Sequence, residues 1–292
     1  MTAEVRPLCA PGSLLGEGIV WDHARQCAWF VDIKKRLLWR YDPASGESRN
    51  WAAPDQIGWA LPAEGGRLLC GLTDGLYLFA PDSGAFDFHR EVPGEPETNR
   101  LNDACTDPWG RVWFGSMDDA ETDASGRFYC YDRGKVRTAG PQGIAITNGP
   151  AVDATGSRIY FTDTLARRIY VAPLTNDGVG ESRLFADTAR DFPDAYPDGP
   201  VVDADGHVWT GLYLGGKVAR YSPDGALEAV IVIPARDVTK MQFGGPDLAT
   251  AFVTTATKNM EASDMQDYPD AGSLFAFDAP VAGIATAMVK LP

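Results

Sequence analysis

The stretch VVDADGHVWTGLYLGGKVARYSPDGALEAVIVIP, residues 201–234, has the pattern of a small antiparallel sheet. A short apolar strand leads into an aspartate-rich turn and an aromatic strand. A glycine turn, an alternating strand, a second turn and a last apolar strand follow. Short alternating segments rich in Val, Tyr and Trp and separated by D-x-x-G turns are typical of antiparallel β-structure. The stretch therefore predicts one four-stranded unit.

The same phrase recurs along the chain at intervals of about 40 to 50 residues. The copies align on the residue that opens the first turn, which is Asp22, Pro62, Asp107, Asp153, Asp203 and, in a copy with a longer insertion, Gly244. No segment of ten or more residues has a helical period. Repeated four-stranded units are typical of a propeller, which closes on itself and leaves no long sheet edge. We therefore predict an all-β fold: a six-bladed β-propeller of four-stranded antiparallel blades, forming one domain over residues 1–292.

The outer strand of the last blade has two candidate sources, one at each end of the chain. Either the first ten residues or the C-terminal TAMVKLP (286–292) would supply the outer strand of the last blade. Residues 258–272, KNMEASDMQDYPDAG, interrupt the last copy and are expected to form an exposed loop.

Oxygen-bearing side chains recur at one position of the repeat. The first strand of each propeller blade lines the central channel, so equivalent residues form a ring around the axis. The position five residues before each aligned residue, called here the axial slot, holds Glu17, Ile57, Asn102, Asn148, Asp198 and Thr239. Glycine follows the slot in four of the six copies, and it lets the chain bend and leave the preceding side chain exposed. We therefore expect Glu17, Asn148 and Asp198 to point into the channel.

Two carboxylates near one axis repel each other unless a cation lies between them. Glu17, Asn148 and Asp198 offer hard oxygen ligands, which suit one divalent cation: Ca²⁺, Mg²⁺, Mn²⁺, Fe²⁺ or Zn²⁺. With few protein ligands, the remaining positions would hold water or substrate, which favours a catalytic site. The alternative is that these are turn residues, because Asn-Gly and Asp-Gly pairs form turns readily. A shared register does not follow from turn chemistry, and Glu-Gly is a poor turn pair.

At these residues the sequence resembles the SMP-30/gluconolactonase/LRE-like family, the regucalcin-type sugar lactonases, which include bacterial xylonolactonases. The resemblance runs from LLGEGIVWD (14–22) to DVTKMQFGGPDLATAFVTTA (237–256). Between them lie NRLNDACTDPWGRVWFGSMD (99–118), TNGPAVDATGSRIYFTDT (147–164) and YPDGPVVDADGHVWTG (196–211). The resemblance implies a six-bladed propeller, one divalent metal in the channel, and hydrolysis of aldonolactones such as xylonolactone or gluconolactone.

The resemblance also implies roles for individual residues. The family's metal ligands fall on Glu17, Asn148 and Asp198, and its substrate-contacting arginine and asparagine fall on Arg100 and Asn102.

One site residue of the family has no single counterpart here. A substrate-binding glutamate follows the stretch that corresponds to Gly115–Met117, where this chain continues DDAETDASG. The spacing leaves Asp118, Asp119 and Glu121 open, and we take Glu121 as the expected residue.

Hydrolysis of a lactone requires a polarised carbonyl, an activated water and stabilisation of the developing charge. A metal in the channel would act as a Lewis acid and lower the pKa of a water. Asp198 would act as general base. Arg100 and Asn102, two residues apart on one side of a strand, would donate hydrogen bonds to sugar hydroxyls or to the oxyanion. The alternative for Arg100 is a surface ion pair with a nearby aspartate.

Composition excludes several other classes of function. The net charge of −14, from 26 basic and 40 acidic residues, argues against a nucleic-acid partner. No apolar stretch approaches the roughly 20 residues of a membrane span, and the first residues lack the apolar core of a signal peptide, so we expect a cytoplasmic protein. A closed propeller is by default a monomer. The five scattered cysteines and three separated histidines predict reduced thiols and no Cys/His zinc site.

Two other functions fit the predicted fold. One is a non-enzymatic calcium-binding propeller, which has no need for an arginine beside converging carboxylates. The other is a phosphotriesterase or arylesterase on the same fold; such proteins are membrane-associated or secreted and carry a different ligand set.

Overall fold

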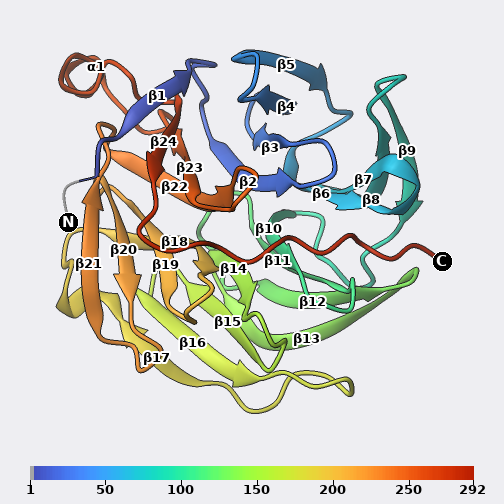
Figure 1. The fold of residues 1–292 in the computed structure, drawn as a ribbon. Helices are drawn as coiled ribbons and strands as arrows, with labels where there is room; N and C mark the ends of the chain where they lie inside the picture. Colours follow the sequence, from blue (N-terminus) through green and yellow to red (C-terminus); the bar gives the residue numbers. More distant parts are fainter. Residues whose placement is uncertain (1–2) are drawn as a thin grey trace.

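The computed structural model describes residues 3–292, whose β-sheets are arranged in a ring around a central axis (Figure 1). The chain runs around this ring from blue through green and yellow to red. Within each unit, consecutive strands are antiparallel neighbours. The fold is therefore an all-β propeller arrangement, as the alternating pattern predicts.

Four sheets in the described part of the chain have four strands each. The first comprises β2 (Gly16–Asp22), β3 (Cys27–Asp32), β4 (Leu37–Asp42) and β5 (Glu47–Ala52). The second comprises β6 (Ile57–Ala63), β7 (Arg67–Leu72), β8 (Gly75–Ala80) and β9 (Ala85–Arg90). The third comprises β10 (Asn99–Thr106), β11 (Val112–Asp118), β12 (Gly126–Asp132) and β13 (Lys135–Ile144). The fourth comprises β14 (Thr147–Val152), β15 (Arg158–Asp163), β16 (Arg168–Pro173) and β17 (Arg183–Asp187).

The remaining strands form one eight-stranded sheet, in the order β1-β24-β23-β22-β18-β19-β20-β21. Its strands are β1 (Arg6–Cys9), β18 (Tyr196–Val202), β19 (Val208–Tyr213), β20 (Lys217–Tyr221), β21 (Leu227–Val232), β22 (Asp237–Gly244), β23 (Thr250–Ala256) and β24 (Leu274–Asp278). The prediction of six separate four-stranded blades is therefore wrong: residues 3–292 form four four-stranded sheets and one sheet of eight strands.

The last two repeat units share one sheet through a parallel pairing at which a glycine permits close approach. β18 and β22 pair in parallel at Gly199 and Lys240. A Cβ atom on Gly199 would lie only 2.8 Å from Lys240 Cγ, so only glycine lets the two strands come this close. The repeat pattern does not reveal this contact, because each unit was aligned as an independent copy.

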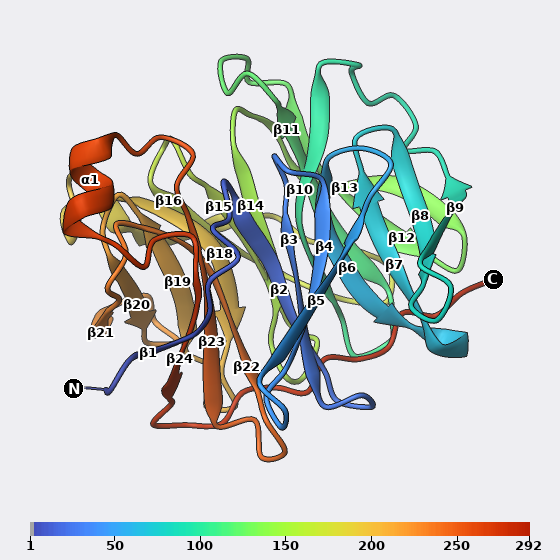
Figure 2. The ribbon, with the colours of Figure 1, turned by 90° about the horizontal axis from the view of Figure 1, so that it is seen from above.

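The N-terminal residues supply the outer strand next to β24, since β1 pairs antiparallel with it. The C-terminal residues, which were the other candidate for that strand, do not join that sheet edge. They cross one end of the ring, where Gly283 bridges to Asp203 and Val289 bridges to Ala63. Figure 2 shows this segment at the end of the ring opposite to the helix α1.

The aligned aspartates close the turns that the sequence predicts and also anchor the core. Asp203 accepts hydrogen bonds from the backbone N–H groups of Asp205 and His207, and from Trp209 Nε1 at 2.9 Å. Asp107 accepts the equivalent bond from Trp113 Nε1, also at 2.9 Å. Both tryptophans are fully buried. In these two copies the repeated aspartate ties its turn to an aromatic residue between the sheets.

Helical structure is limited to short segments within residues 3–292: the 3₁₀ turns η1 (Glu64–Gly66) and η2 (Thr188–Arg190), and α1 (Ala262–Asp267). α1 lies inside the segment 258–272 that we expected to be a loop, and a capping box between Glu261 and Asp264 starts it. Six residues are too few for a periodic pattern to be recognised. No helix among the described residues is long and apolar enough to cross a membrane. The five cysteines are free thiols.

Candidate active site

A β-bulge interrupts the first strand of every repeat at the axial slot. In β2 the regular pairing breaks between Glu17 and Val20, and in β10 it breaks between Leu101 and Ala104. The same break occurs in β6, β14, β18 and β22. Bulges bend a strand and re-aim its side chains. They account physically for slot residues that point toward the axis, an orientation that simple strand alternation does not predict.

All six site residues expected from the sequence line one pocket, with an empty volume of about 470 Å³. The pocket lies at the end of the ring where the first strands begin. The six are Glu17, Arg100, Asn102, Glu121, Asn148 and Asp198. They come from four different sheets and one loop, so the ring brings together residues that lie up to 181 positions apart, from 17 to 198.

Glu17 and Asp198 are buried carboxylates that share one environment. Burial, together with the nearby charge of Asp103 and against the opposing charge of Lys240, raises the pKa of Glu17 to about 7. Burial also raises the pKa of Asp198 well above its ordinary value, and the charge of Glu17 adds to this effect. Asp198 Oδ1 is buried and accepts no hydrogen bond from any described residue. The pair is costly to ionise unless a positive charge lies beside it.

Asn148 is held by hydrogen bonds on both sides of its amide. Its Oδ1 accepts a bond from Asn102 Nδ2 at 2.9 Å, and its Nδ2 donates to Thr164 Oγ1 at 2.9 Å. Thr164 in turn donates to the carbonyl oxygen of Pro197, at 2.9 Å. A carbonyl oxygen has two lone pairs, so Asn148 Oδ1 keeps one for a further partner. Thr164 was not among the residues expected from the sequence.

These donors fit a hard divalent cation with an incomplete protein shell. Glu17 and Asp198 supply carboxylate oxygens, Asn148 supplies an amide oxygen, and the unpartnered Asp198 Oδ1 is available. The part of the chain that the structure describes has no group of three or more His, Cys, Asp or Glu side chains arranged to hold a metal. The donor set therefore differs from a closed structural site, because only two of its members are acidic.

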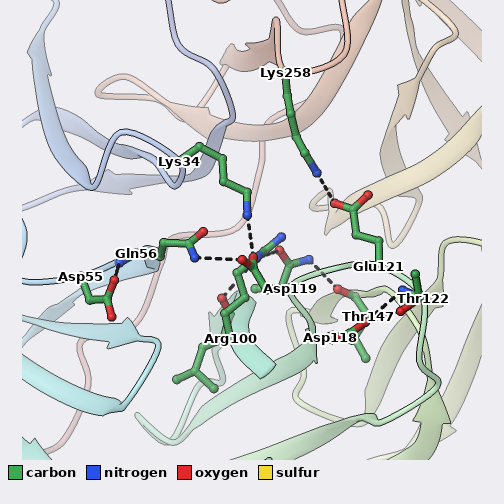
Figure 3. A network of polar contacts seen from close by, with 12 residues as sticks. Lys34, Asp55, Gln56, Arg100, Asp118, Asp119, Glu121, Thr122, Thr147 and Lys258 are labelled. Atoms are coloured by element: carbon green, nitrogen blue, oxygen red, sulfur yellow. Dashed lines mark hydrogen bonds and ion pairs between the residues drawn. The ribbon is translucent and has the colours of Figure 1, made fainter. Parts of the chain in front are cut away.

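Arg100 is buried and is not the surface residue that its alternative interpretation required. Its Nε donates to Asp119 Oδ1 at 2.9 Å, and its Nη1 donates to Asn102 Oδ1 at 2.5 Å. Figure 3 shows Lys34 and Gln56 converging on Asp119 from neighbouring segments, at 2.6 and 3.1 Å. Burial alone would raise the pKa of Asp119, but these hydrogen bonds and the charge of Arg100 outweigh it and lower the pKa to about 2. Arg100 is thus held by a permanent anion.

The structure separates the three acidic residues that the sequence could not. Asp118 closes its own loop by accepting hydrogen bonds from the backbone of Thr122 and Asp123 at 3.0 and 3.1 Å. Asp119 holds Arg100. Of the three, Glu121 lines the pocket, where it forms an ion pair with Lys258 from the segment before α1 (Figure 3). The role of Glu121 in binding substrate stays a prediction.

Two buried charges beneath the pocket escaped the sequence interpretation. Lys240 forms an ion pair with Asp103, and both side chains are buried. Each follows an axial slot, in the place where the other four copies have glycine. The absence of glycine after these two slots was the feature of the sequence that could have pointed to this pair.

Known proteins resemble this chain over nearly its whole length. The family model of the SMP-30/Gluconolactonase/LRE-like region matches residues 15–257. A 6-deoxy-6-sulfogluconolactonase from Pseudomonas putida is 32% identical over 274 residues, which cover 94% of each chain. An L-arabinolactonase from Azospirillum brasilense is 34% identical over 280 residues, covering 94% of this chain and 91% of the arabinolactonase. The solved structure of a calcium-binding protein, regucalcin, from Agrobacterium tumefaciens has a TM-score of 0.95 at 29% identity, covering 100% of this chain and 99% of that one.

Proposed function

The chain belongs to the SMP-30/gluconolactonase/LRE-like family and is a lactonase, and we propose that it hydrolyses a sugar aldonolactone to the aldonic acid with the help of one divalent cation. The observation that carries this proposal is the convergence of Glu17, Asn148 and Asp198 on one pocket beside the buried Arg100.

Glu17, Asn148 and Asp198 are the proposed ligands of the cation. Two carboxylates with raised pKa values provide a strong reason for a cation to bind, since it would offset their mutual repulsion. The similarity to a calcium-binding regucalcin supports a divalent ion. When bound, the cation would polarise the lactone carbonyl and increase the acidity of a water. The candidate cations are Ca²⁺, Mg²⁺, Mn²⁺, Fe²⁺ and Zn²⁺.

The chain's own groups have distinct proposed tasks. Asp198 would hold the cation through one carboxylate oxygen and accept the proton of the attacking water on the other. Arg100 and Asn102 donate hydrogen bonds to substrate oxygens, including the oxygen on which negative charge develops. Glu121, at the edge of the pocket, accepts a hydrogen bond from a sugar hydroxyl.

The proposed substrates are five- and six-carbon aldonolactones, such as xylonolactone or gluconolactone. The similar proteins include an arabinolactonase and a sulfogluconolactonase, whose names refer to a five-carbon and a six-carbon sugar. A pocket lined by an arginine, a lysine, three asparagines and three acidic residues beside apolar side chains suits a ligand that carries several hydroxyls.

The test combines removal of the cation with a change of the proposed base. Lactone hydrolysis is measured as acid release on a panel of pentono- and hexonolactones, with the spontaneous opening subtracted. Chelation is expected to reduce the rate nearly to the spontaneous one, and one of the five cations should restore it. Asp198→Asn should lower kcat by about 100-fold or more, the usual contribution of a general base.

Asp205→Asn is the matched control, because Asp205 is an exposed aspartate in the turn that follows β18. Wild-type rates in both the chelated protein and Asp198→Asn would refute the proposed mechanism.

A further inference from the structure

The residue that follows the axial slot divides the repeats into two kinds. Four copies have glycine there: Gly18, Gly58, Gly149 and Gly199. The other two have Asp103 and Lys240. These two lie on β10 and β22, which stand on opposite sides of the ring because β14 and β18 separate them on one side and β2 and β6 on the other. Opposite charges therefore face each other across the axis.

The two side chains meet in space that the glycines leave free. Lys240 Nζ donates to Asp103 Oδ1, and both residues are almost fully buried. Asp103 Oδ2 accepts a hydrogen bond from the backbone N–H of Gly149 at 2.9 Å. A Cβ atom on Gly199 would lie 3.0 Å from Asp103 Oδ2 and 2.8 Å from Lys240 Cγ. A side chain at position 199 would thus displace the pair.

The pair lies directly beneath the proposed cation ligands. Gly149 and Gly199, which it contacts, follow Asn148 and Asp198 in the chain. Lys240 also lines a second cavity on the far side, toward the C-terminal segment, and it is absent from the lining of the upper pocket. Both charges act on Glu17, with opposite effects on its pKa. A buried ion pair contributes little net stability, so its position beside a charged site calls for another role.

We propose that Lys240 and Asp103 are a positioning and charge-balancing pair for the site: Asp103 holds the backbone next to Asn148, and Lys240 cancels the charge of Asp103. Glu17 and Asp198 then remain the uncompensated anions that face the cation. This inference rests on the proposed function for the nature of the ligand, and it concerns residues that neither contact the substrate nor belong to the proposed ligands.

The proposal predicts opposite effects for two single substitutions. Asp103→Asn keeps an oxygen acceptor for Gly149 but leaves Lys240 uncompensated, so the affinity for Mn²⁺ or Ca²⁺ should fall by about tenfold. Lys240→Met leaves the Asp103 charge uncompensated, so the affinity should rise by about tenfold. The double substitution restores the net charge and should return the affinity to within about threefold of wild type. Binding is measured by titration calorimetry at pH 8, and folding by circular dichroism.

A buried ion pair elsewhere in the chain provides the matched control. Arg111 and Asp107 form such a pair at the opposite end of β10, with Nε to Oδ2 at 2.6 Å. Arg111→Met should lower the unfolding midpoint without changing cation affinity. A merely structural role for Lys240 and Asp103 would weaken binding in both single variants.

The outcomes separate this inference from the proposed function. Loss of affinity in both single variants, or a loss of more than tenfold in the double variant, overturns the inference while wild-type binding and hydrolysis stand. If a single variant does not fold, the cation affinity of the double variant decides. An affinity within about threefold of wild type supports the inference, and a loss of more than about tenfold overturns it. Failure of the wild-type protein to bind either cation overturns the inference together with the proposed cation site.

Discussion

Asn102 Nδ2 donates a hydrogen bond to Asn148 Oδ1 at 2.9 Å, which joins a proposed substrate-binding residue on one sheet to a proposed cation ligand on the next. The same Nδ2 donates to the carbonyl oxygen of Thr147 at 2.6 Å. Asn102 therefore lines the pocket and also forms hydrogen bonds with the neighbouring strand β14.

Asn102→Leu should weaken cation binding although Asn102 is not a proposed ligand. The substitution removes the donor that orients Asn148, and loss of such an outer partner typically lowers metal affinity by 10- to 100-fold. Calorimetric titration with a divalent cation measures the effect. Thr162→Val is the control, because Thr162 pairs with Asn148 in the strand register and its buried hydroxyl has no partner among the described residues. Equal affinity in wild type and Asn102→Leu would contradict the orienting role.

Asp119→Asn should reduce kcat/KM by roughly tenfold, because Arg100 would lose the anion that fixes its Nε and would bind substrate in a less defined position. Cation affinity should remain unchanged. Asp55→Asn is the control, since Asp55 forms an ion pair with Arg36 at the surface and takes no part in holding Arg100. A loss of cation affinity in Asp119→Asn would show that Asp119 acts on the cation site instead.

The pH dependence of the ion pair between Arg100 and Asp119 has a definite sign. The pKa of Asp119 is lowered to about 2, below the value of about 3.9 expected in an unfolded chain. The stabilisation from its ionised form is therefore fully present above about pH 4 and is lost as the pH falls toward 2. The ratio of wild-type to Asp119→Asn kcat/KM should consequently be constant between about pH 5 and 9. A ratio that changes within this range would assign the titration to another group.

Residues that depend on the repeat register could be predicted from the sequence. Glu17, Asn148 and Asp198 occupy the same position in three copies, and a closed ring must then bring them to one axis. The repeat could not reveal the bulge that aims these side chains, because its glycine signal is shared with ordinary turns.

Features that depend on contacts between units were beyond the sequence pattern. The parallel pairing of Gly199 with Lys240 merges two units into one sheet, and only the close approach of their backbones creates it. Asp103 and Lys240 lie 137 residues apart, and neither differs in the sequence from an ordinary charged residue of a strand. The division of labour between Asp119 and Glu121 depends on which of them meets Arg100 and which meets Lys258 in space.

Asp203→Ala tests the structural role of the aligned aspartates. Asp203 is fully buried, accepts Trp209 Nε1 at 2.9 Å and forms an ion pair with Arg220 at 3.0 Å. Its removal leaves the indole N–H without its acceptor and Arg220 with only the exposed Glu228 as a partner, so the free energy of unfolding should fall by about 3 kcal/mol. Asp153→Ala is the control at the same repeat position, because Asp153 accepts only from its own turn, Ser157 N–H among the donors.

The control should lose about 1 kcal/mol or less, since Asp153 is partly exposed and its turn groups can bind water instead. Urea unfolding monitored by tryptophan fluorescence measures both variants, and cation affinity should be unchanged in each folded protein. Equal losses of stability at the two positions would mean that the turn itself, and not its bond to the buried tryptophan, accounts for the recurring aspartate.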